Sequence, residues 1–169
     1  ADAKIIDGKP WLTSEHLFDY SPEFIEDFLP YTIELGRSFI CPKYQSGASS
    51  TKSIYALDNL WDGIGALIVK FKAKYLFGKA SIYSHFGDDA FAIIRYFLNL
   101  YFADSRNLVY AKNPIKTDVS EEIKSLFCGN NYKDDYVVLK RELKKLDRHI
   151  PPLVNSYMNV SPSMIAFDS

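Results

Sequence analysis

The spacing of apolar residues changes along the chain, and these changes predict its strands and helices. Apolar and polar residues alternate over 32–40, which is typical of a strand, and Pro42 ends that pattern. The following segment, 51–71, repeats apolar residues every three or four positions, which predicts an amphipathic helix. Aromatic residues then dominate 73–83 and predict a second strand, with Gly78 at a bulge or a close backbone approach.

Helical patterns also flank this strand–helix–strand segment. We expect a short helix that stops by Leu29, with Ser21 as its N-cap and Pro22 at its first helical position. The segment AKII near the start is expected to form a short strand. Downstream, the pattern predicts helices over 88–102, 121–127 and 134–150, a loop over 103–120, and a last helix after Pro151-Pro152. The alternation of strands and helices indicates an α/β or α+β class.

Composition narrows the class of protein. A chain of 169 residues with 47% apolar and 15% aromatic residues is expected to form one globular domain. The net charge of −1 argues against a general nucleic-acid binder, which needs excess lysine and arginine. No run reaches the roughly 18 apolar residues of a spanning helix, and the first residues do not resemble a signal peptide. We therefore expect a cytoplasmic protein.

The thiols and histidines suggest no metal site. Only Cys41 and Cys128 are present, and the three histidines stand at no ligand spacing relative to them. We expect both cysteines to be free, in a reducing compartment.

The loop between the first strand and the long helix is a candidate phosphate site. Small residues let a backbone approach a phosphate closely, and the N–H groups and dipole of a following helix attract an anion. The loop lacks the glycine and lysine pattern of a Walker A motif, so a simple helix cap remains the other interpretation. Its residues are Gln45, Ser46, Gly47, Ala48, Ser49, Ser50, Thr51 and Lys52.

Glu34 and Arg37 place ionisable groups inside the first predicted strand. Three positions apart on a strand, their side chains point to opposite faces, so they need not pair with each other. One interpretation is an edge strand with solvated charges. The other is that Glu34 faces a cleft as a proton acceptor while Arg37 holds an acidic partner or locks the strand.

Several motifs together resemble a known family. ELGRSF, the CPKYQSG loop, LDNLWDGIGALI and YLFGKAS, with NNYKDDY and HIPPLVNSYMNVSPSM further on, resemble the GNAT-type N-acyltransferases that make ornithine and glycine lipids in bacteria. Members of this hemolysin-like family share their fold with the acyl-homoserine-lactone synthases. The resemblance covers roughly residues 21–164. It implies a central mixed sheet flanked by helices, and the chain would begin at the family's third strand, as a partial domain or one partner of a composite site.

The resemblance also implies a chemistry. Two parallel strands that splay apart would hold the pantetheine arm of an acyl carrier protein or of coenzyme A, with its phosphate on the loop 45–52. The acyl-phosphopantetheine is a co-substrate, and no permanent cofactor or metal is expected. Glu34 would serve as base, supported by Arg37, and a backbone N–H near Phe39 or Ile40 would stabilise the oxyanion. Ser81 or Tyr83 would protonate the leaving thiolate, or else simply pack in the strand.

The basic face of the predicted helix 134–150 has two interpretations. It is either a solvated face or a docking surface for an acidic carrier protein or anionic headgroups at the inner face of the membrane. Its residues are Lys140, Arg141, Lys144, Lys145 and Arg148. The function expected from the resemblance is acyl transfer to the amine of an amino acid such as glycine or ornithine. The alternative is a non-catalytic module that binds acyl carrier protein or lipid; no spanning segment supports a pore-forming activity.

Overall fold

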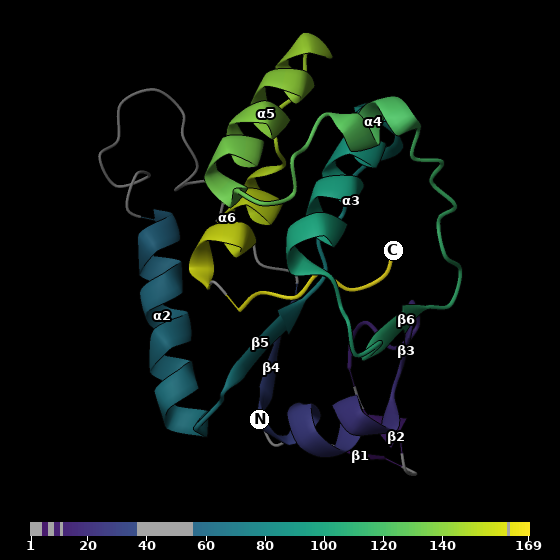
Figure 1. Cartoon of the computed structure of the whole chain (residues 1–169). Helices are drawn as coiled ribbons and strands as arrows, with labels where there is room; N and C mark the ends of the chain where they lie inside the picture. The colour runs from purple at the N-terminus through teal and green to yellow at the C-terminus, as the bar shows by residue number, and fades with distance from the viewer. Residues whose placement is uncertain (1–4, 7–8, 11, 37–55, 162) are drawn as a thin grey trace. The chain divides into compact units, whose positions relative to one another are not determined.

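A computed structural model describes residues 5–6, 9–10, 12–36, 56–161 and 163–169 (Figure 1). The chain divides into two compact units, Ala1–Lys79 and Ala80–Ser169, and each is described by itself. The expectation of one domain over the whole chain stays a prediction. Arg37, Phe39, Ile40, Cys41 and the loop 45–52 lie outside the described residues.

The first unit begins with a short hairpin and a compact helical turn. Strand β1 (Ile5–Ile6) pairs antiparallel with β2 (Lys9–Pro10), which confirms the predicted short strand. Strand β3 (Phe18–Tyr20) leads into the π-helix η1 (Phe24–Phe28) and the 3₁₀ helix η2 (Leu29–Tyr31). The Ser21 hydroxyl accepts a hydrogen bond from the Phe24 N–H at 3.1 Å, as its predicted capping role requires.

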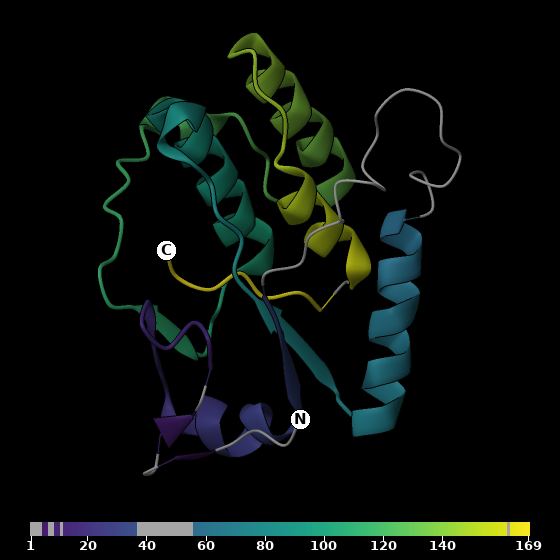
Figure 2. The ribbon, with the colours of Figure 1, turned by 180° about the vertical axis from the view of Figure 1, so that it is seen from behind.

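A parallel strand pair forms the centre of the first unit, and its two strands lie side by side in both views (Figures 1 and 2). Strand β4 (Thr32–Leu35) pairs with β5 (Tyr75–Gly78), and helix α2 (Ala56–Phe71) comes between them in the sequence. In this register Glu34 stands opposite Phe77. Phe77 is buried with Phe24, whose ring lies 5.6 Å from it, and this aromatic contact anchors the pair.

The predicted bounds of the second strand were wrong. The second strand was predicted over 73–83, but β5 ends at Gly78, where its partner β4 ends opposite at Leu35. A strand needs a hydrogen-bonding neighbour, and Lys79 to Tyr83 follow the last paired position without strand structure. In the described part of this unit β1–β2 and β4–β5 are separate two-stranded sheets, and the predicted central mixed sheet stays a prediction.

The second unit is mainly helical. Helix α3 (Asp88–Phe102) has the bounds that the sequence predicted, and it contacts α4 (Glu121–Ser125) and α5 (Tyr132–Lys145). The remaining elements are η4 (Ser84–Phe86), β6 (Val109–Ala111) and α6 (Pro152–Val160). The core consists of fully buried residues of α3 and α5, packed with aromatic rings: Phe97, Leu139 and Leu143, with Phe127 and Tyr132. Strand β6 lies within residues 103–120, which the sequence predicted to be a loop.

The predicted bounds of the basic helix, 134–150, were also wrong. Helix α5 starts earlier because the Asn131 side chain accepts from the N–H groups of Lys133 and Asp134. It ends at Lys145 because Asp147 adopts a left-handed conformation, with φ of 55°. The Arg148 N–H then bonds back to the Leu143 carbonyl at 2.9 Å, which closes a Schellman-type turn.

In the part of the chain that the structure describes, no helix combines the length and the apolar character needed to cross a bilayer.

Candidate functional site

The Glu34 carboxylate in β4 is held by a turn about twenty residues earlier in the chain. Its Oε2 accepts from the Thr13 N–H at 2.6 Å, and its Oε1 accepts from the Ser14 N–H at 3.0 Å. The Ser14 hydroxyl donates to the same Oε1 at 2.7 Å. A carboxylate offers about four acceptor positions, so three are filled and one, on Oε2, stays open to a further donor within the described residues.

A tyrosine extends this hydrogen-bond network. Ser14 is 1% exposed, and its Oγ lies 2.9 Å from the Tyr20 hydroxyl. Because the single Ser14 hydroxyl proton goes to Glu34, Tyr20 is the donor to Ser14. Burial raises the pKa of Tyr20 to about 12, and the nearby charge of Glu34 adds to this. Tyr20 is therefore protonated at neutral pH and can donate this hydrogen bond.

This arrangement can do two things chemically. It holds Glu34 in one orientation, with an acceptor position left for a water molecule or an amine. It also ties the Thr13–Ser14 turn to β4, since a buried hydroxyl and two backbone N–H groups depend on the carboxylate. The sequence indicated Glu34 but gave no sign of Thr13, Ser14 or Tyr20, because a contact across twenty residues leaves no periodic pattern.

The two predicted proton donors for the thiolate belong to the second unit. Ser81 and Tyr83 are exposed and precede η4. The sequence predicted that both would lie in a strand, and neither does. The Tyr83 ring stacks on His85 with a centroid separation of 5.7 Å. Their role in the reaction stays a prediction.

The five basic residues predicted to dock a partner are not equivalent. Arg141 and Lys145 form ion pairs with Glu142 at 2.8 and 2.7 Å. Arg148 follows the helix, and its guanidinium donates to the backbone carbonyls of Phe86 and His85 at 2.9 and 3.2 Å.

Lys140 and Lys144 have no ion pair within the described residues. The Lys140 ammonium lies over the Tyr136 ring, 4.8 Å from its centroid.

The described residues contain no group of three or more histidine, cysteine or acidic side chains placed to hold a metal ion. Cys128 is exposed and free, in agreement with the sequence-based expectation for this residue.

Over nearly its whole length, the chain is similar in sequence to two curated bacterial N-acyltransferases. The relatives are the glycine N(alpha)-acyltransferases of Phocaeicola vulgatus, 44% identical, and of Bacteroides thetaiotaomicron, 46% identical. Both alignments span 162 residues and 95% of this chain, but only 50% and 48% of the relatives. The chain thus spans about half the length of these curated relatives, and the resemblance inferred from its motifs is confirmed.

No family model matches the chain. No solved structure matches it either, so the GNAT topology stays a prediction. The order of strands and helices in the structure itself confirms the mixed α/β class.

Proposed function

We propose that this chain carries N-acyltransferase activity and moves a fatty acyl group from a thioester to the amine of glycine, in the synthesis of bacterial membrane lipids. The observation that carries the proposal is the 44–46% identity to two glycine N(alpha)-acyltransferases over 95% of the chain. Identity at this level across nearly every element favours a shared chemistry over a shared fold alone.

The acyl donor in this proposal is a phosphopantetheine thioester, carried by acyl carrier protein or by coenzyme A. The parallel pairing of β4 and β5 supports a slot for the tether, because the pairing ends at Leu35 and Gly78 and the next described residues, Gly36 and Lys79, do not continue it. The loop 45–52 would hold the phosphate, and the N–H of Phe39 or Ile40 would face the oxyanion. These assignments rest on the sequence motifs.

The reaction has a simple balance. The glycine nitrogen forms a bond to the thioester carbonyl carbon, the carbon–sulfur bond breaks, and the sulfur leaves as a thiolate that takes up a proton. An amine is mostly protonated at neutral pH, so it must first give a proton to a base, directly or through water. The nitrogen loses a second proton after it attacks, and this proton balances the one that the thiolate takes up. Glu34 is our candidate for that base, since among the described residues one acceptor position of its fixed carboxylate has no donor. Ser81 or Tyr83 would return a proton to the thiolate, and Arg37 would hold the strand or an acidic group.

Replacing Glu34 tests this assignment. Glu34→Gln should lower the turnover number by about 10²–10⁴, which is the usual contribution of a general base. Glu26→Gln is the matched control, because Glu26 is an exposed acid of the same unit and should leave turnover unchanged. Tryptophan fluorescence verifies that the variants fold, since Trp11 and Trp61 both belong to residues 1–79. A folded Glu34→Gln variant with normal turnover would remove Glu34 as the base.

A second function is a module that binds an acyl carrier or lipid without turnover. The observation in its favour is that the hydrogen bonds from Thr13 and Ser14 give Glu34 a structural role that requires no catalysis. Release of free thiol from acyl carrier protein or acyl-coenzyme A, measured with and without glycine, separates the two functions. Glycine-dependent release supports acyl transfer, whereas binding of the donor with no release supports the module.

A further inference from the structure

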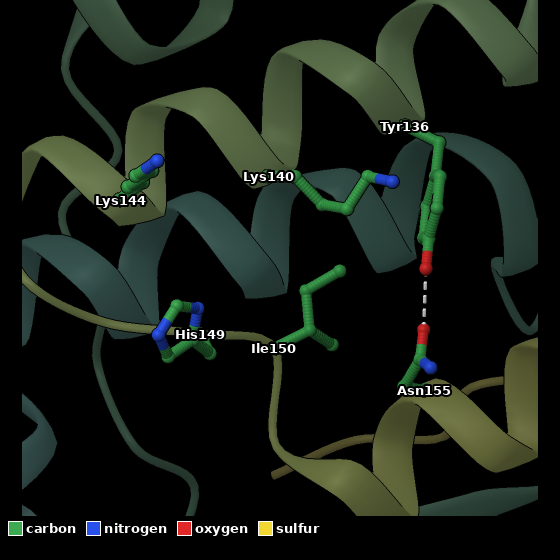
Figure 3. A pocket seen from close by; sticks show the side chains of 6 residues that line it. All are labelled: Tyr136, Lys140, Lys144, His149, Ile150 and Asn155. Atoms are coloured by element: carbon green, nitrogen blue, oxygen red, sulfur yellow. Dashed lines mark hydrogen bonds between the residues drawn. The ribbon is translucent and has the colours of Figure 1, made fainter.

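The second unit contains a pocket lined by α5, the turn that follows it and the start of α6. Its volume is about 340 Å³. Figure 3 shows Lys140 and Lys144 along α5, Ile150 and His149 on the turn, and the Tyr136–Asn155 pair at one end. The volume lies at the lower end of the roughly 300–1,000 Å³ typical of small-molecule sites, and it exceeds the volume of a single inorganic oxyanion severalfold.

The lining of this pocket carries positive charge and no carboxylate. Glu142, the acid nearest in sequence to the two lining lysines, is already paired with Arg141 and Lys145. Neither Lys140 nor Lys144 has an ion pair in the described part of the chain. The two ammonium groups therefore direct a charge of about +2 at the pocket, without an internal counter-ion, and an anion is the ligand that this field favours.

Asn155 adds a hydrogen-bond donor. Its Oδ1 accepts from the Tyr136 hydroxyl at 2.5 Å and from Asn159 Nδ2 at 3.5 Å, which fixes the orientation of the amide. The Asn155 NH₂ group is left without an acceptor among the described residues, and Figure 3 shows it beside the bonded oxygen. Ile150 and the Tyr136 ring supply apolar surface next to these donors.

We propose that this pocket binds the phosphate monoester group of a small organic molecule. A phosphate monoester carries about −1.5 to −2 charges at neutral pH, which matches two ammonium groups without an ion pair among the described residues better than the single charge of a carboxylate does. Lysine is also a common phosphate ligand, whereas planar carboxylates are typically bound by the arginine fork, which this lining lacks. The apolar surface and the extra volume fit the organic part of the ligand.

This site is separate from the loop 45–52 that the proposed function assigns to the donor phosphate, and its binding requires no acyl transfer. The phosphate monoester could come from the donor side, as free 4′-phosphopantetheine, or from the lipid side, as glycerol 3-phosphate. The binding experiment therefore uses both compounds, together with inorganic phosphate, and it measures affinity without any acceptor. Its failure would leave the acyl-transfer assay, and so the proposed function, untouched.

Isothermal titration calorimetry on the chain gives the dissociation constants. The double variant Lys140→Gln/Lys144→Gln should weaken the binding of the better organic phosphate by at least about tenfold, because it removes two charge-assisted hydrogen bonds. The matched control is Lys133→Gln, which removes a charge from an exposed position of the same helix outside the pocket lining. It should change the affinity by less than about twofold. The far-ultraviolet circular dichroism of each variant verifies that α5 is intact.

Tighter binding of either organic phosphate than of inorganic phosphate, lost in the double variant alone, supports the site, and the tighter compound names the source. Equal affinity for inorganic phosphate would indicate an adventitious ion only and overturn the proposal. An equal loss of affinity in Lys133→Gln would show that the effect comes from the general charge of the helix, and this result would also overturn the proposal. No measurable binding of either organic compound would also overturn it, even if the chain bound anionic vesicles through the same lysines.

Discussion

At the scale of single residues, the interactions of Glu34 decide how its predicted role is understood. The carboxylate is fixed by Thr13 and Ser14, and Ser14 in turn is held by Tyr20. A base must be positioned before it can act on a substrate, and this network provides that positioning from within the first unit. The same network stabilises the fold, so stability and activity must be measured separately.

Ser14→Ala tests the structural part of the network. The substitution removes the hydroxyl that accepts from Tyr20 and donates to Glu34, which leaves two partly buried polar groups short of a partner. We expect the free energy of unfolding of the first unit to fall by about 1–3 kcal/mol, measured by urea titration with tryptophan fluorescence. Thr13→Ala is the control for loss of a hydroxyl, because the exposed Thr13 side chain makes no hydrogen bond within the described residues and its backbone N–H still donates to Glu34. An unchanged midpoint for Ser14→Ala would contradict the network.

The pH dependence of stability tests Tyr20. Burial raises the pKa of Tyr20 from its ordinary value of 10.0 to about 12, so the folded protein holds the phenol proton more tightly than the unfolded chain does. This contribution to stability is fully present below about pH 10 and is lost as the pH rises through about 12. The stability difference between the wild type and Tyr20→Phe should therefore shrink between about pH 9 and about pH 11.5. A difference that is constant over this range would contradict the buried, hydrogen-bonded phenol.

At the scale of elements, the ends of α5 show where a local pattern is enough and where it is not. Asn131 is a capping residue type next to a helical pattern, yet the helix was predicted to start only at residue 134. Its C-terminal end depends on the left-handed Asp147 and on the bond from Arg148 to Leu143. Arg148 is also held by carbonyls of η4, more than sixty residues earlier. No periodic pattern could have predicted such a contact.

The cap of α5 can be tested by one substitution. Asn131→Ala removes the side-chain oxygen that accepts from Lys133 and Asp134, and it should destabilise the second unit by about 1 kcal/mol. The neighbouring Asn130→Ala is the control, because Asn130 is exposed and makes no hydrogen bond through its side chain in the described structure. Urea unfolding followed by circular dichroism measures both. Equal effects of the two substitutions would show that the cap contributes nothing.

At the scale of the whole molecule, the sequence predicted the mixed α/β class and the similarity to N-acyltransferases better than it predicted how the elements pack. Helix α3 was predicted with its observed bounds because it is apolar nearly all round and starts at acidic residues after a glycine. The parallel pairing of β4 and β5 was also foreseen, although β5 is shorter than predicted. The pocket of the second unit was not predicted, because it forms only where α5, a turn and α6 meet. Of the residues that line it, only Lys140 and Lys144 had been predicted to bind a partner.

The similarity to two glycine N(alpha)-acyltransferases is the support for the proposed function, which is acyl transfer to glycine. The most direct measurement is mass spectrometry of the product formed from the chain, an acyl carrier protein thioester and isotopically labelled glycine. Acyl transfer to glycine should give an N-acylglycine whose mass increases by the mass of the label, with one free thiol released per product. Consumption of the thioester with no labelled product, or no consumption by a folded chain that binds the donor, would contradict it.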